Sequence, residues 1–180
     1  MDLETLESIF QRQKELAERF HRIETSNLGL THSIPIDLDS FHGQAVMRLF
    51  VTYFVEEMWE FNKAETADSQ REELADALHF LVELMLMGGV TPLALNTMPV
   101  LRLPEYVSGS SVGILLHALR NRPWKLYVGQ ANLGNIRYAL CMVYREFLNL
   151  VEEAGVEEKD LIDAYFDKVK VNHTRINSGN

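Results

Sequence analysis

The sequence lacks the features that would place it in several specialised classes of protein. Its 180 residues include one cysteine, Cys141, which excludes an internal disulfide framework and a cysteine-rich zinc site. No apolar run reaches the roughly 18 residues that a membrane span needs, and the acidic first residues do not resemble a signal peptide. We therefore expect a cytoplasmic protein with no membrane partner.

Positive charge is also scarce. The chain has 17 Lys and Arg residues against 26 Asp and Glu residues, which gives a formal net charge of −9. Nucleic acids and membrane surfaces are polyanions and repel such a protein over long range. We therefore expect no nucleic-acid partner. Apolar residues make up 47% of the chain, which is ordinary for a globular protein of this length.

The local periodicity of the chain is almost entirely helical. Apolar residues recur at three- and four-residue steps, and the alternation typical of strands is nearly absent. We predict helices over residues 3–23, 40–63, 69–88, 110–121, 131–153 and 158–175, with loops at 25–35, 90–107 and 122–129. The middle loop has room for at most one short helix. The sequence thus predicts an all-α fold, a helical bundle of about five to six helices in a single domain, residues 1–180.

Two local signals bound the third of these helices. Ser69 and Glu72 have the spacing of a capping box, so we expect the helix to begin there. Gly88 and Gly89 follow its last apolar residues, and glycine is the residue that most often ends a helix.

The second predicted helix carries acids on its apolar side. Phe50, Phe54 and Phe61 form an aromatic stripe, and helical geometry places Glu57 within that stripe. Glu60 borders the same face one turn later. The three-residue spacing brings the two carboxylates to one face, with β-carbons about 5–6 Å apart.

The third predicted helix repeats this arrangement. Glu73 and Asp76 are three residues apart and border the apolar face that Phe80 and Leu84 occupy. Beyond Ala77 the helix is apolar on nearly all sides, which is typical of a central helix. A short connector favours antiparallel packing of the second and third helices, and this packing would bring the two acidic pairs together.

Four converging carboxylates need compensation for their repulsion. At an effective dielectric constant of ~20, one pair of charges ~4 Å apart costs about 4 kcal/mol. Some of the acids must then be protonated, or cations must bind between them. Oxygen ligands favour a hard, partly hydrated ion, so we expect Mg²⁺, with Mn²⁺ as the alternative, on Glu57, Glu60, Glu73 and Asp76.

Two other interpretations of these acids stay open. They can be half-exposed carboxylates paired with lysines, although Lys63 is the only base near Glu57 and Glu60 in the sequence. They can also belong to a di-iron bundle, which requires Glu-x-x-His motifs. Glu18 and His21 match that motif, and Asp76 with His79 nearly does.

Polar residues in the first and last helices form a second group of candidates. Lys168, Asn172 and Arg175 step by four and three residues and therefore share one helical face. The two bases can hold phosphates and the asparagine can reach a ribose or phosphate oxygen. A solvated helix end is the alternative. Gln13 lies between apolar neighbours, and its amide can read a pyrimidine edge or simply occupy the helix flank.

Three stretches carry the residue order of a known family. They are residues 6–16, residues 56–60 with 72–80, and residues 165–179. The Glu-Glu-x-x-Glu and Glu-x-x-Asp motifs resemble those of the all-α nucleoside triphosphate pyrophosphatases. The Lys-x3-Asn-x2-Arg stretch resembles the dimeric dUTPases of that superfamily. One departure is Ala17, which stands where the family usually has an asparagine.

The resemblance implies an all-α pyrophosphatase fold and an enzymatic function. The expected reaction is hydrolysis of dUTP to dUMP and pyrophosphate by a metal-activated water, with dUDP as a further substrate. It implies catalytic and metal-binding roles for the four carboxylates, and substrate contacts for Gln13, Lys168, Asn172 and Arg175. Among the glutamates, the flanking position of Glu60 favours it as the base that takes the proton of water. A homodimer is also implied.

Two alternative functions remain at this stage. The departure at Ala17 allows a pyrophosphatase for another nucleotide, such as dCTP. A protein of the same fold that binds a partner without turnover is the other alternative, and the intact acidic motifs disfavour it.

Overall fold

The computed structural model describes residues 1–28, 34–97, 110–119 and 132–178. Every regular element in these ranges is helical, in agreement with the predicted all-α class. The helices are α1 (Leu3–Leu28), α2 (Phe41–Lys63), α3 (Ala67–Gly88), α4 (Pro92–Thr97), α5 (Ser110–Ala118), α6 (Leu133–Glu153) and α7 (Glu158–Ser178). Six of them correspond to the predicted helices. Helix α4 is the one short helix that the predicted loop at residues 90–107 allowed.

The ends of α3 follow from local side-chain chemistry. Thr66 accepts a hydrogen bond from the backbone N–H of Ser69, and the Ser69 hydroxyl accepts one from the backbone N–H of Thr66. This capping box corrects the predicted start, because the pair that caps the helix lies three residues before Ser69 and Glu72. The predicted end is confirmed: Gly89 adopts φ 68°, a left-handed conformation that favours glycine.

Other predicted boundaries differ by a few residues. Helix α1 continues to Leu28, so the first part of the predicted loop at 25–35 is helical. Helix α5 ends at Ala118, before the predicted end at 121. Asn132 caps α6 by accepting a hydrogen bond from the backbone N–H of Asn135. Gly179, which contributed to the family resemblance, lies outside the described residues.

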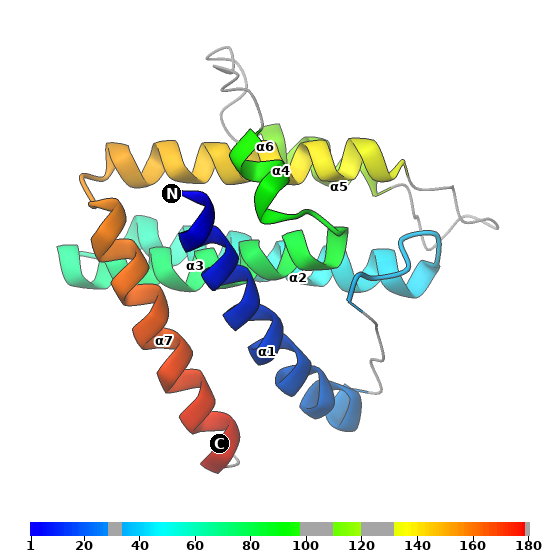
Figure 1. The fold of residues 1–180 in the computed structure, drawn as a ribbon, viewed down its shortest axis with the longest axis horizontal. Helices are drawn as coiled ribbons and strands as arrows, with labels where there is room; N and C mark the ends of the chain where they lie inside the picture. The colour runs from blue at the N-terminus through cyan, green and yellow to red at the C-terminus, as the bar shows by residue number, and fades with distance from the viewer. Residues whose placement is uncertain (29–33, 98–109, 120–131, 179–180) are drawn as a thin grey trace.

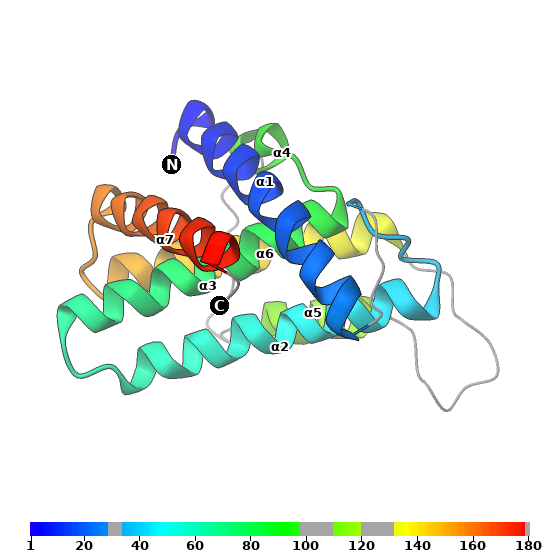
Figure 2. The same ribbon diagram turned by 90° about the horizontal axis from the view of Figure 1, so that it is seen from below.

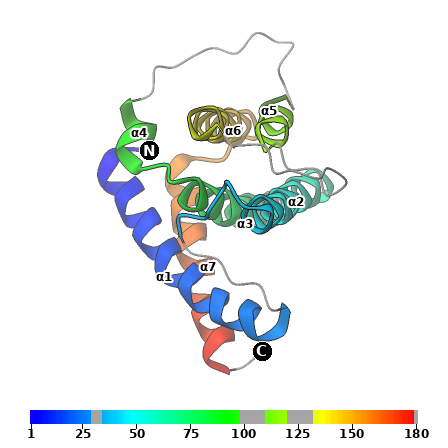
Figure 3. The same ribbon diagram turned by 90° about the vertical axis from the view of Figure 1, so that its right-hand side faces the viewer.

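The helices form three layers, with α2 and α3 in the middle. The two helices lie antiparallel and side by side (Figure 2). Helices α5 and α6 pack together on one side of this pair, and α1 and α7 pack on the other side (Figures 1 and 3). Helix α3 contacts α1, α2, α6 and α7, and it is therefore the central helix that its apolar composition predicts.

The main hydrophobic core surrounds α3. Leu74, Leu78, Leu81 and Met85 are fully buried there and meet apolar residues of the helices on both sides. No helix in the described part of the chain is long and apolar enough to cross a membrane. Because α3 is central, its polar side chains face neighbouring helices instead of solvent. The candidate site forms where these side chains meet polar residues of the other helices.

Candidate functional site

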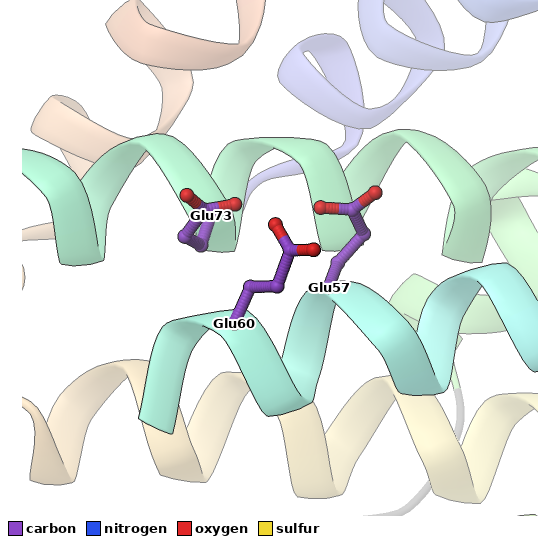
Figure 4. A group of neighbouring side chains, drawn as sticks. All are labelled: Glu57, Glu60 and Glu73. Atoms are coloured by element: carbon purple, nitrogen blue, oxygen red, sulfur yellow. The ribbon is translucent and has the colours of Figure 1, made fainter. Parts of the chain in front are cut away.

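Three of the four predicted metal-binding carboxylates meet where α2 and α3 face each other. Figure 4 shows Glu57 and Glu60 of α2 and Glu73 of α3 pointing toward one another. Each offers a carboxylate oxygen, and these three oxygens lie within 4.8 Å of one another. The three-residue spacing on α2 and the antiparallel packing of α3 produce this convergence, as expected from the sequence.

The acidic cluster is electrostatically unfavourable without a cation. Burial, followed by the charges of Asp76, Glu60 and Glu73, raises the pKa of Glu57 from its ordinary value of 4.5 to about 7. Burial and the neighbouring carboxylates also raise the pKa of Glu73. Within the described ranges, none of the three glutamates forms an ion pair. Lys63, the base nearest in sequence, lies over the Trp59 ring instead, with Nζ 5.2 Å from the ring centroid.

Asp76, the fourth predicted ligand, lies beside the cluster and is paired with α7. Lys168 Nζ donates to Asp76 Oδ2 at 2.6 Å and to Glu72 Oε1 at 3.4 Å. Burial raises the pKa of Asp76, although Lys168 acts in the opposite direction. Burial acts to lower the pKa of Lys168, but the two carboxylates outweigh it and raise that pKa. The pair therefore connects the acidic cluster to a predicted substrate-binding residue.

A pocket of about 340 Å³ brings the predicted site residues together. Its walls come from four helices, α1, α2, α3 and α7. All four predicted substrate-binding residues line it, together with two of the four carboxylates. The lining residues are Gln13, Leu16, Phe20, Phe50, Tyr53, Glu57, Asp76, His79, Phe80, Glu83, Lys168, Asn172 and Arg175.

One wall of the pocket is aromatic. The ring centroids of Phe50 and Tyr53 are 5.6 Å apart, and those of Tyr53 and Phe80 are 5.4 Å apart. Phe50 and Phe80 also meet edge to face, at 6.3 Å. These aromatic rings offer an apolar surface, which suits a nucleobase or the apolar side of a sugar.

Gln13 lies in the pocket wall within a buried hydrogen-bond network. Its side chain is 2% exposed, and its Nε2 donates to Glu83 Oε2 at 3.1 Å. His79 Nδ1 lies 2.7 Å from Gln13 Oε1, and the Tyr165 hydroxyl donates to the same oxygen at 3.0 Å. The Tyr165 hydroxyl also lies 3.2 Å from the carbonyl oxygen of Ile9, so it shares its proton between two acceptors. This burial is inconsistent with a residue of the helix flank.

His79 is a neutral member of this network. Burial lowers its pKa to about 4, and its ring stacks on Tyr165 with centroids 4.2 Å apart. Both ring nitrogens face an oxygen, and the shorter contact, 2.7 Å from Nδ1 to Gln13 Oε1 against 3.3 Å from Nε2 to the Tyr165 carbonyl, favours the N–H on Nδ1. With the N–H on Nδ1, the contact of Nε2 with the Tyr165 carbonyl is not a hydrogen bond, because a neutral ring has no second N–H to donate. Both ring nitrogens face protein atoms, and Glu18 is exposed, which argues against the di-iron alternative.

Sequence reasoning missed three residues of this network. Glu83 is 7% exposed and lies within an otherwise apolar stretch of α3, so a charge in an apolar run was the available signal. The sequence pattern around His79 indicates only a candidate iron ligand. Tyr165 carried no signal, because a buried aromatic residue on an amphipathic helix usually belongs to the core. Burial raises the pKa of Tyr165, and the Glu83 charge adds to this effect.

The remaining candidates lie outside the site. Glu56, the first residue of the Glu-Glu-x-x-Glu motif, is exposed on α2 and does not line the pocket. Cys141 is buried in α6, and burial raises the pKa of its thiol, so it is not an activated nucleophile.

The arrangement has the features of a helical nucleotide hydrolase. An acidic cluster suited to cations adjoins a pocket that has an aromatic wall and two basic residues of α7, Lys168 and Arg175. A family model described as dUTPase matches residues 5–180, so the chain belongs to the all-α dUTPase family. The chain is a dUTP diphosphatase-like hydrolase that acts in nucleotide metabolism. No curated protein and no solved structure matched the chain in the corresponding comparisons.

Proposed function

We propose that the chain hydrolyses dUTP, and also dUDP, with Mg²⁺ as the cofactor. With dUTP the products are dUMP and pyrophosphate, so water adds to a phosphorus atom and the anhydride bond between the α- and β-phosphates breaks. The observation that carries the proposal is the acidic cluster of Glu57, Glu60 and Glu73, whose oxygens lie within 4.8 Å without an ion pair. The cluster lies beside a pocket that fits a nucleobase and the phosphate groups of a nucleotide.

The residues of the cluster fit a hard divalent cation. All of its donors are carboxylate oxygens, which Mg²⁺ prefers, and Mn²⁺ accepts the same ligands. Asp76 is the fourth ligand in this proposal, and its contact with Lys168 keeps its carboxylate beside the cluster. When bound, the metal neutralises phosphoryl charge and activates water for in-line attack. Burial and the charges of the neighbouring carboxylates raise the pKa of Glu57, so a bound cation would relieve an unfavourable charge there.

The remaining site residues bind and orient the substrate. Lys168, Asn172 and Arg175 of α7 line the pocket and offer two positive charges and an amide to the triphosphate. Glu60 is exposed at the edge of the cluster, so its carboxylate is placed to accept a proton from water. The uracil base of the nucleotide lies against the aromatic wall in this proposal, which excludes water from that side of the nucleotide.

A nucleotide panel tests this function. Pyrophosphate release from dUTP, dCTP, dTTP and UTP is measured with Mg²⁺, with Mn²⁺ and with excess chelator. We expect dUTP to be the preferred substrate and the chelator to abolish its turnover. Asp76→Asn should lower kcat/KM at least about a hundredfold, because several kcal/mol of charge stabilisation are lost. Glu56→Gln, an exposed neighbour of the cluster, is the matched control and should leave turnover unchanged.

The same panel decides between the alternatives. Steady dUTP turnover in excess chelator would refute the metal-dependent mechanism. Preferred turnover of dCTP would replace the proposed substrate by the alternative one. Absence of turnover with every nucleotide would favour the partner-binding alternative.

The assembly and location of the protein are further parts of the proposal. We propose a single domain over residues 1–180 and a homodimer in the cytoplasm. The exposed apolar side chains of Val55 and Trp59, one turn apart on α2, support an interface there, with exposed fractions of 45% and 61%. A single buried cysteine, Cys141, is compatible with a reducing compartment.

A further inference from the structure

The orientation of the Gln13 amide is fixed by its neighbours. Gln13 Nε2 donates to Glu83 Oε2, so the NH₂ group of the amide faces Glu83. The opposite side, Oε1, then accepts from His79 Nδ1 and the Tyr165 hydroxyl. The carbonyl oxygen of Gln13 therefore faces protein donors and does not accept a hydrogen bond from a ligand.

Gln13 and Glu83 therefore present a hydrogen-bond donor and an acceptor side by side in the pocket. The Nε2 atom of Gln13 carries two N–H groups, and Glu83 is its one acceptor among the residues described. The second N–H remains for a ligand, and both residues line the pocket. The Glu83 carboxylate has four lone-pair sites, so it can accept a hydrogen bond from a ligand N–H while it holds Gln13.

We propose that Glu83 is a specificity-determining residue, which with Gln13 reads a pyrimidine that has a carbonyl at position 4 and an N–H at position 3. The inference rests on the proposed nucleotide function and names the base edge that this site selects. The Gln13 N–H donates to the carbonyl oxygen at position 4, and the N–H at position 3 donates to the Glu83 carboxylate. His79 and Tyr165 are positioning residues, because they act through the orientation of Gln13.

Cytosine reverses both contacts. Its amino group at position 4 would meet the Gln13 N–H, donor against donor. Its bare nitrogen at position 3 would meet the Glu83 carboxylate, acceptor against acceptor. Unpaired polar groups in a buried site discriminate strongly, so we expect a preference of about a thousandfold or more for dUTP over dCTP in kcat/KM.

Glu83→Gln tests the pair in the full-length protein with Mg²⁺. The glutamine has the same size but can offer an N–H to the bare nitrogen of cytosine. We expect the ratio of kcat/KM for dUTP to that for dCTP to fall about ten- to a hundredfold. Tyr165→Phe keeps the ring that stacks on His79 and removes one donor to Gln13, and it should lower the ratio by a smaller factor, about three- to tenfold. Tyr144→Phe, a buried tyrosine of α6 outside the pocket, should leave the ratio unchanged.

The ratio separates a role in specificity from a role in stability. An unchanged ratio in folded Glu83→Gln, with folding checked by circular dichroism, would overturn the proposal. Should that variant unfold, an unchanged ratio in Tyr165→Phe would overturn it. Absence of dUTP turnover in the unmodified protein would refute the proposed function instead. Calorimetric binding of dUMP and dCMP then tests the pair alone: a preference for dUMP that Glu83→Gln removes supports it, and equal binding of the two overturns it.

Discussion

Replacing Glu57 by glutamine should stabilise the metal-free protein at neutral pH. Glu57 is the cluster carboxylate whose pKa rises furthest, to about 7 from an ordinary 4.5, through burial and then the charges of Asp76, Glu60 and Glu73. A folded-state pKa above the unfolded value means that the folded protein holds the proton more tightly. The penalty from ionised Glu57 is thus absent below about pH 4.5, grows as the pH rises to 7, and is complete above that pH.

The magnitude follows from the same pKa values. The difference between about 7 and 4.5 corresponds to at most about 3.4 kcal/mol. Glu57 is half-exposed, and solvent screening reduces this to about 1–2 kcal/mol. Glutamine keeps the shape of the side chain and removes its charge. We therefore expect Glu57→Gln to gain about 1–2 kcal/mol over the unmodified protein at pH 8 and only about 0.3–0.5 kcal/mol at pH 5.

Urea unfolding in the presence of a chelator measures this difference. The unmodified protein, Glu57→Gln and the matched control Glu56→Gln are compared at pH 5 and pH 8, with circular dichroism as the readout. Saturating Mg²⁺ should reverse the order at pH 8, because the ion binds the folded unmodified protein more tightly than the variant. The reasoning is refuted if Glu57→Gln is less stable than the unmodified protein in chelator, or if the difference is the same at both pH values.

Three further outcomes follow from the structure. Arg175→Ala should lower kcat/KM about ten- to a hundredfold, because it removes a charge-assisted contact with the substrate. Lys170→Ala, at an exposed position of α7 outside the pocket, is the control and should not lower kcat/KM. Equal effects of the two variants would show that the α7 face is ordinary surface. Gly89→Ala should cost about 1–2 kcal/mol in urea unfolding, because φ is 68° and the new β-carbon would lie 2.9 Å from Arg137 Nη2. Gly113→Ala meets no atom within 4 Å and is the control, and an equally stable Gly89 variant would contradict the argument. Light scattering at micromolar concentration should give twice the mass of the chain, and a monomeric mass would exclude the proposed homodimer.

Several features of the site could be predicted because they depend on one helix or on neighbouring helices. Helical periodicity places Glu57 and Glu60 on one face of α2, and a short connector favours the antiparallel contact that brings in Glu73. The common face of Lys168, Asn172 and Arg175 follows in the same way. The capping box was assigned three residues too late, because Thr66 and Ser69 offer an equally valid pair. Local signals of this kind locate a helix end to within a turn.

Spacing along the chain determined that the protein is helical and that acids interrupt its apolar faces, because both are properties of a single helix. The sequence could not determine which side of Gln13 faces the pocket, since this depends on contacts that span 66 to 152 positions of the chain. Nor could it show that Lys168 holds Asp76 or that Glu83 lies beside Gln13. These contacts exist because α1 and α7 both pack on α3, and only tertiary packing decides which polar groups share one buried site.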